Sequence, residues 1–221
     1  DPLSDKNRDL PPEFVTSVLE KFQIDPKRPI LTQISRFDRL KDPIGVCRVY
    51  QSVKSSIPDL QLVLAGGGAS DDPEGAEVLA EVREAAGDDP DIHILELPPT
   101  AHMEINALQH GSTIVMQKSL KEGFGLTVSE GMWKGKPVIA SAVGGIVSQI
   151  KHGITGELVR SESGAAQSVK KLLTNPEYAK QLGIAAKEHV RNNFLLTRHM
   201  KDYMLLFLFV MKGSRHGLIS G

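Results

Sequence analysis

The sequence predicts an α/β protein built on a doubly wound, Rossmann-like parallel sheet of about six strands, with helices on both faces and extra helices at the C-terminus. Two observations carry this prediction. Short apolar, β-branched runs alternate along the chain with longer segments whose apolar residues recur at helical spacing. The short runs are apolar without interruption, which is typical of strands buried on both faces, and strands separated by helices pair in parallel.

The expected elements fill the chain from position 13 to position 210. A first helix is expected at residues 13–22, after a polar, proline-rich start. Strands are expected at residues 29–35, 60–65, 92–95, 112–117, 138–141 and 156–159. Further helices are expected at residues 44–57, 73–86, 101–110 and 125–134, then a short helical turn at 144–150 and three helices after the last strand.

Capping residues mark several of these boundaries. Asp42 followed by Pro43 is typical of an N-cap and the first residue of a helix. Gly135 follows the last helical residue before the fifth strand, where a glycine commonly ends a helix. The three C-terminal helices are expected to break at Pro176 and near Asn192.

The composition narrows the class of protein. A chain of 221 residues with 40% hydrophobic content can bury a substantial core. The formal net charge of −1 gives no electrostatic reason to expect nucleic acid or an anionic membrane as a partner. Cys47 is the single cysteine, which excludes an internal disulfide, and its apolar surroundings predict a buried structural thiol. The N-terminus has no apolar signal-peptide core, so we expect a cytoplasmic protein.

The C-terminus carries a continuously apolar segment at residues 204–211. It is less than half of the roughly 20 residues that span a bilayer, so we expect a helix that docks onto another surface rather than a membrane span. The predicted division of the chain is a linker at residues 1–12, one domain at 13–210 and a tail at 211–221, which is expected to be disordered or foreign to the native chain.

Two glutamates flank a glycine turn after the fourth strand. Ligands of doubly wound sheets bind beyond the carboxyl ends of the strands, which directs attention to this loop. Gly123 and Gly125 let the backbone approach an anion, and the helix start that follows offers free N–H groups. Glu122 would lie before the helix, and Glu130 about one turn inside it, near enough to reach a ribose. At this spacing alone, two unrelated surface glutamates are an equally good interpretation.

Two other loops meet the same edge. Arg36 and Lys41 follow the first strand, and both side chains suit phosphate oxygens. Taken alone this pair is more typical of a solvated loop, and its place at the ligand edge favours binding. Gly144 and Gly145 form a second turn that a phosphate or sugar could approach. The histidines show no metal-ligand spacing, and neither a nucleophile elbow nor a P-loop occurs.

With these residues the chain resembles the C-terminal, nucleotide-sugar-binding domain of the retaining GT-B glycosyltransferases of family 4, over about residues 29–191. The pieces, in chain order, are Ser35-Arg36 with Lys41, the Glu122 and Glu130 pair, residues 135–140, Gly144-Gly145 and residues 153–159. A narrower likeness, to trehalose-forming synthases and trehalose phosphorylases, is carried by residues 1–7, 105–109, 112–119 and 143–146, with Gln149 where many relatives have Glu. Gly131 departs from the small Ala usual after the second Glu.

The resemblance implies a role for each matching residue. Arg36 and Lys41 would bind the diphosphate and stabilise the leaving nucleotide, and Glu122 would contact the donor glucose, which makes these three the candidate catalytic residues. Glu130 would bind the ribose hydroxyls. The glycine turn, residues Gly123, Phe124, Gly125, Leu126 and Thr127, would bind the phosphate, with its amides at 125–127 as donors. The backbone near Ile94 and Leu95 would meet the base.

The donor implied is UDP- or ADP-glucose, and the product implied is trehalose. No permanent cofactor is expected, and Mg²⁺ is compatible with such a site but is not indicated by the sequence. The resemblance also implies an N-terminal domain that supplies the acceptor site and is absent from this sequence, so the chain alone is expected to bind nucleotide without efficient transfer. The apolar segment would then be exposed and would favour self-association. A phosphorylase using glucose 1-phosphate and a non-catalytic nucleotide-binding module stay open as alternatives.

Overall fold

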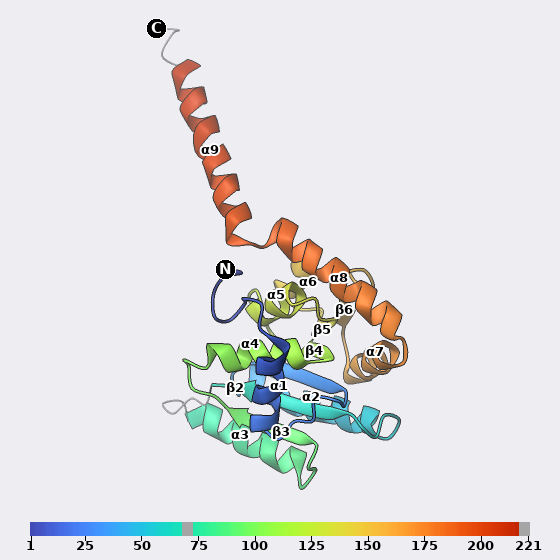
Figure 1. The fold of residues 1–221 in the computed structure, drawn as a ribbon. Helices are drawn as coiled ribbons and strands as arrows, with labels where there is room; N and C mark the ends of the chain where they lie inside the picture. Colours follow the sequence, from blue (N-terminus) through green and yellow to red (C-terminus); the bar gives the residue numbers. More distant parts are fainter. Residues whose placement is uncertain (68–72, 217–221) are drawn as a thin grey trace.

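The computed structural model describes residues 1–67 and 73–216 and shows a six-stranded sheet between two layers of helices (Figure 1). Its strands are β1 (Ile30–Ile34), β2 (Gln61–Gly66), β3 (Ile92–Glu96), β4 (Ile114–Gln117), β5 (Val138–Ser141) and β6 (Glu157–Val159). Every neighbouring pair is parallel, and the order is β3-β2-β1-β4-β5-β6. This order confirms the predicted doubly wound, Rossmann-like sheet.

The helices follow the predicted sequence of elements closely. They are α1 (Pro12–Lys21), α2 (Pro43–Lys54), α3 (Pro73–Ala86), α4 (His102–Gly111), α5 (Leu126–Trp133), α6 (Ile146–Gln149), α7 (Glu162–Thr174), α8 (Pro176–Asn193) and α9 (Leu196–His216). A short 3-10 helix, η1 (Arg39–Lys41), was not predicted and shapes the loop before α2. Asp42 caps α2 as expected, because its Oδ1 accepts a hydrogen bond from the Gly45 amide at 3.1 Å.

Alternate residues of each strand face opposite helical layers. Leu31 packs in the core shared with α2, α3 and α7, while its neighbour Ile30 packs in a second core with α1 and α4. Met116 and Val115 divide in the same way between the first core and a third, formed with α5, α6 and α8. Cys47 lies fully buried in the first core, and this burial raises the pKa of its thiol to about 11. Both faces of the sheet are therefore covered, as the uninterrupted apolar runs predicted.

The strand order places a crevice between β1 and β4. From β1 the chain winds outwards to β2 and β3, and from β4 it winds the other way to β5 and β6. The loops after β1 and β4 therefore diverge at the carboxyl edge of the sheet, which is where doubly wound folds bind ligands. Gly131 lets α5 pack closely on the sheet beside this crevice, since a Cβ there would lie 3.1 Å from Val115 Cγ1.

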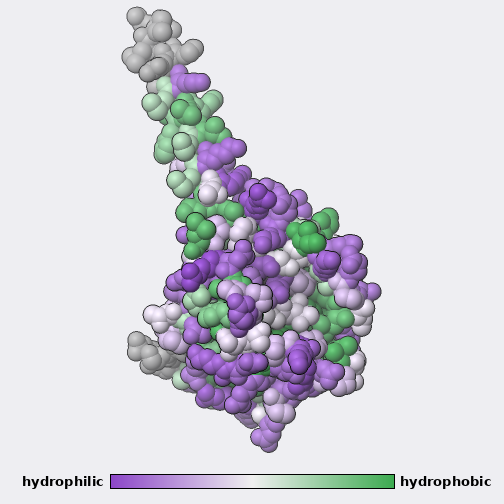
Figure 2. All heavy atoms as spheres, viewed as in Figure 1, coloured by the Kyte–Doolittle hydropathy of each residue, from purple (hydrophilic) through white to green (hydrophobic). Residues whose placement is uncertain are grey.

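Helix α9 points away from the rest of the chain (Figure 1), and its apolar side chains form a hydrophobic surface in Figure 2. Phe209 is 77% exposed, and the neighbouring apolar side chains are also exposed. The helix continues through residues 211–216, where a tail was predicted. Residues 217–221 lie outside the described part of the chain. No helix in the described ranges has both the length and the apolar character needed to cross a membrane.

Candidate functional site

The loop between β4 and α5 places Glu122 opposite Lys41, which ends η1. Lys41 Nζ lies 2.5 Å from Glu122 Oε2, and the Ser119 hydroxyl donates to the same oxygen at 3.3 Å. The Lys41 and Glu122 side chains are only 20% and 12% exposed. The structure therefore brings one predicted cation and one predicted carboxylate together at the carboxyl edge of the sheet.

Buried Gln33 on β1 holds the two loops in register. Its Nε2 donates to the Lys41 carbonyl at 2.9 Å, and its Oε1 accepts from the Lys118 amide at 2.8 Å. Lys118 in turn pairs through its ammonium with the Asp42 carboxylate that caps α2. The position of Lys41 is thus determined by the loops on both sides of the crevice.

Helix α5 begins at the glycine turn. Gly125 adopts φ 85°, a left-handed conformation that glycine adopts without strain, and a Cβ there would lie 3.2 Å from Glu122 Cγ. None of the described side chains caps the first amides of α5. The Thr127 hydroxyl donates to Gln117 Oε1 at 2.9 Å, which ties the helix start to the end of β4. The amides at this end of α5 suit an anion.

The second glycine turn supports the first one. The Gly145 amide donates to the Gly123 carbonyl at 3.1 Å, and a Cβ on Gly144 would collide with the carbonyl oxygen of Glu122. Gln149, fully buried, donates through Nε2 to the carbonyls of Phe124 and Gly125. Gly144 and Gly145 therefore lie under the Glu122 loop, packed against its backbone, which gives these glycines a structural reason apart from contact with a ligand.

A hollow of about 350 Å³ lies between the ends of β1 and β4, and we call it the turn hollow. It is lined by Ile34, Ser35, Lys41, Gln117, Glu122, Phe124, Gly125, Leu126 and Thr127. Six of the predicted site residues are among these, so the cation, the carboxylate and the glycine turn share one space.

Three other predicted residues lie elsewhere. Arg36 follows Ser35, but its side chain is 68% exposed and its Nη2 pairs with Asp38 at 3.1 Å. Ile94 and Leu95 lie on β3 at the edge of the sheet, two strands from β1, and they do not line the turn hollow. The structure thus groups Lys41 with Glu122 and leaves Arg36 and the β3 backbone apart from them.

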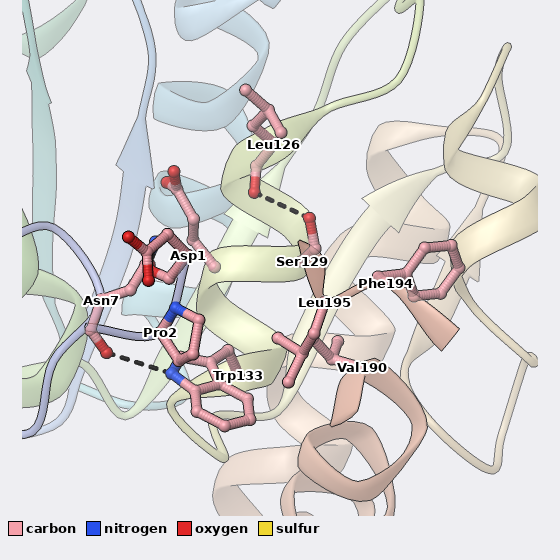
Figure 3. A pocket seen from close by; sticks show the side chains of 10 residues that line it. Asp1, Pro2, Asn7, Leu126, Ser129, Trp133, Val190, Phe194 and Leu195 are labelled. Atoms are coloured by element: carbon pink, nitrogen blue, oxygen red, sulfur yellow. Dashed lines mark hydrogen bonds between the residues drawn. The ribbon is translucent and has the colours of Figure 1, made fainter. Parts of the chain in front are cut away.

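Glu130 lies on α5 beside a second hollow of about 220 Å³, which we call the arm hollow. Figure 3 shows the side chains that line this hollow. Its lining residues are Asp1, Pro2, Asn7, Leu126, Ser129, Glu130, Trp133, Val190, Phe194 and Leu195. Glu130 is 8% exposed; its Oε1 lies 3.2 Å from Lys6 Nζ, and its buried Oε2 has no hydrogen-bond partner among the described residues. Leu126 lines both hollows, so they meet at the start of α5.

Residues 1–9, which we call the N-terminal arm, lie against α4 and α5 (Figure 1). Trp133 Nε1 donates to the Asn7 carbonyl at 3.0 Å, as Figure 3 shows. Lys134 Nζ donates to the Lys6 carbonyl at 2.9 Å and to Asn7 Oδ1 at 3.1 Å. Burial lowers the pKa of Lys134 to about 8; Glu130 opposes this shift and Lys6 reinforces it.

Helix α4 holds the arm from the other side. Buried Asn106 donates through Nδ2 to the carbonyls of Asp5 and Arg8, at 2.9 Å each. Nearby His110 is kept neutral, because burial and then the charges of Lys134 and Lys136 lower its pKa to about 4. Sequence reasoning missed these contacts, since they join residues about a hundred positions apart that follow no local spacing.

Nothing in the described ranges groups three or more His, Cys, Asp or Glu side chains in a way that could hold a metal ion. What the site offers instead is ammonium, carboxylate, helix-terminal amides and a glycine turn. Groups of these kinds at the topological switch point of an α/β domain are suited to a phosphate-bearing ligand.

The chain belongs to the glycosyl transferases group 1 family, whose model matches residues 16–189. It is 47% identical over 205 residues to a trehalose synthase of Pyrococcus horikoshii, covering 92% of this chain and 49% of that protein. It is 29% identical over 208 residues to a trehalose phosphorylase of Pleurotus pulmonarius, covering 86% of this chain and 28% of that one. The chain thus spans about half the length of the trehalose synthase and 28% of the length of the phosphorylase.

A solved structure shows the same fold. Anabaena HepE in complex with UDP-glucose superposes with a TM-score of 0.75 at 17% identity, over 89% of this chain and 53% of that one. The six-stranded domain described above is therefore one of the GT-B type.

Proposed function

We propose that this chain is the donor-binding part of a retaining, family 4 glucosyltransferase that moves glucose from a nucleoside-diphosphate glucose to a sugar acceptor, with glucose as the acceptor and trehalose as the product. The observation that carries the proposal is the turn hollow, where Lys41 and Glu122 meet the start of α5. Such a donor requires a helix start that can bind the anionic diphosphate, a cation beside that helix start and a carboxylate for the sugar hydroxyls.

In this proposal the diphosphate lies at the amino end of α5. The amides of Gly125, Leu126 and Thr127 and the Lys41 ammonium would donate to its oxygens. Arg36, exposed on the adjoining loop, would leave Asp38 and add a second cation. As the bond to the sugar breaks, negative charge grows on the departing phosphate, and prearranged donors stabilise it most at that stage.

Glu122 and Glu130 would hold the two ends of the donor. Glu122 lies in the turn hollow, where its carboxylate would accept hydrogen bonds from glucose hydroxyls. Glu130 lies about 7.5 Å along the helix from Gly125 at 1.5 Å per residue, and its unpartnered oxygen would accept from the ribose. The proposal that the backbone of Ile94 and Leu95 meets the base rests on the family resemblance alone.

The relatives support this choice of substrate class. The trehalose synthases share 44% to 47% identity with the chain, and Anabaena HepE was solved with UDP-glucose. Because the chain spans about half of those synthases, donor binding is the property proposed for the chain itself, and transfer is proposed for the full-length protein.

A second candidate is a trehalose phosphorylase that uses glucose 1-phosphate. The match to the Pleurotus phosphorylase favours it, and the same cations would hold inorganic phosphate. Product analysis of the full-length protein separates the two: release of trehalose from a nucleoside-diphosphate glucose supports the synthase, whereas trehalose formed only from glucose 1-phosphate supports the phosphorylase.

Calorimetric titration of the chain with UDP and with ADP tests the site. We expect Arg36→Ala and Glu130→Ala each to weaken binding of the preferred nucleotide about tenfold, the effect of losing one charge-assisted hydrogen bond. Lys27→Ala and Glu20→Ala, which alter exposed charges outside the site, are the matched controls. Unchanged affinity in both site variants would exclude this assignment.

A further inference from the structure

Lys6 is the one described group that pairs with the Glu130 carboxylate. Its Nζ lies 3.2 Å from Oε1, while Oε2 is buried without a partner. A buried carboxylate needs a counter-charge or donors, because otherwise the loss of hydration is costly. Lys6 supplies that counter-charge from a segment more than a hundred residues away in sequence.

The backbone on both sides of Lys6 is fixed by side chains of the domain. Lys134 donates to the Lys6 carbonyl, and Trp133 donates to the next carbonyl along the chain, that of Asn7. Asn106 donates to the carbonyls of Asp5 and Arg8, which precede and follow them. Four consecutive carbonyls, from position 5 to position 8, are thus hydrogen-bonded to side chains of α4, of α5 or of Lys134, which caps the C-terminal end of α5. The backbone of Lys6 therefore has a defined position, from which the side chain reaches Glu130.

We propose that Lys6 is a positioning residue for the nucleotide site: it holds one oxygen of Glu130 so that the other is presented to the hydroxyls of a ribose. This inference rests on the proposed function, in which Glu130 binds the ribose. Glu130 and Asn7 both line the arm hollow, so the arm forms one wall of the space that the carboxylate faces. The arm then contributes to the site through the orientation of Glu130, without contact between Lys6 and the ligand.

A different role for Lys6 would be direct attraction of the diphosphate. The two roles predict different ligand dependence. A positioning role affects only ligands with ribose hydroxyls, whereas charge attraction affects every anionic ligand, including inorganic pyrophosphate. The 3.2 Å contact with Glu130 already engages the Lys6 ammonium, which favours the first role.

The test compares binding of UDP, 2′,3′-dideoxy-UDP and inorganic pyrophosphate by calorimetry, with ADP and its dideoxy analogue in parallel. For the wild-type chain we expect about tenfold preference for the nucleotide with hydroxyls, which corresponds to about 1.4 kcal/mol. Lys6→Gln should lose most of this preference and keep its affinity for pyrophosphate. Lys6→Arg, which keeps the charge, should restore the preference. Lys27→Gln is the control for loss of one exposed lysine.

Glu130→Gln separates failure of this inference from failure of the proposed function. If Glu130→Gln keeps the full preference for ribose hydroxyls, Glu130 does not bind the ribose, and its role in the proposed function falls together with this inference. If Glu130→Gln loses the preference but Lys6→Gln retains it, only the role of Lys6 is wrong. Equal weakening of all three ligands by Lys6→Gln would also overturn the positioning role. The double variant of Lys6→Gln with Glu130→Gln should lose no more preference than Glu130→Gln alone, because the two residues act through one contact.

Discussion

The two glutamates of the same helix start are held in different ways. Glu122 is held within the sheet domain, by Lys41 on one side and by the backbone of the second glycine turn beneath it. Glu130 is held by Lys6 of the N-terminal arm, a segment that precedes the first helix. One end of the site, around Glu122, is therefore formed by the Rossmann-like fold itself, and we call it the turn end. The other end, around Glu130, depends on the docking of the N-terminal arm, and we call it the arm end.

The largest expected effect is at the turn end. Gln149→Glu would place a carboxylate against the carbonyls of Phe124 and Gly125 in a fully buried position, with no donor left for them. We expect a loss of about 3 kcal/mol in the free energy of unfolding, measured by chemical denaturation near neutral pH. Gln149→Met, which removes the donor without adding a charge, should lose about half as much. Equal stability of Gln149→Glu and the wild type would contradict the role given to this residue.

The arm end should be more sensitive to acid. His110 has a folded-state pKa of about 4, below the unfolded value of about 6.5, because of burial and the nearby lysines. Between these values the unfolded chain binds more protons, so this group lowers stability as the pH falls below about 6.5. The loss reaches about 2 kcal/mol near pH 5. In His110→Gln this loss is absent, so the wild type should lose more stability than the variant between about pH 7 and pH 5; parallel curves would show that His110 is not buried as described.

Much of the turn end could be predicted from the sequence, and little of the arm end. Strand and helix periodicity placed Lys41 and Glu122 on neighbouring loops of one sheet edge, and the structure brings them together. The pairing of Lys6 with Glu130 joins distant segments through side-chain geometry, which no periodicity or motif spacing records. Arg36 illustrates another limit of prediction from sequence. The end of the strand predicted where Arg36 lies along the chain, but the ion pair with nearby Asp38 determines where its side chain points.

A smaller effect is expected for Lys41, the cation of the turn end, and it should differ from the effect of changing Lys6, the counter-charge of the arm end. Lys41→Met removes an ammonium that lines the turn hollow, and we expect about tenfold weaker binding of UDP and of pyrophosphate alike. This contrasts with Lys6→Gln, for which pyrophosphate binding should not change. Calorimetry of both variants with both ligands makes the comparison, and Lys27→Met serves as the control. Unaltered pyrophosphate affinity in Lys41→Met would place the phosphate elsewhere.

The smallest effect on the domain is expected from α9, which takes part in neither end of the site. Its apolar side chains, Leu205 and Phe209 among them, are exposed, and we expect them to favour self-association of the chain. Sedimentation velocity should show a shift towards monomer for Leu205→Glu with Phe209→Glu, while the stability of the domain changes by less than about 0.5 kcal/mol. Lys201→Glu, on the same helix, is the control. Identical sedimentation of all three proteins would exclude α9 as the contact.

A crystal structure of the chain soaked with UDP tests most directly whether the two ends form one nucleotide site. The diphosphate is expected at the amides of Gly125 to Thr127 beside Lys41, with a ribose hydroxyl at the free oxygen of Glu130 and the Lys6 contact intact. A nucleotide bound away from the start of α5, or a ribose that does not approach Glu130, would contradict the site described here.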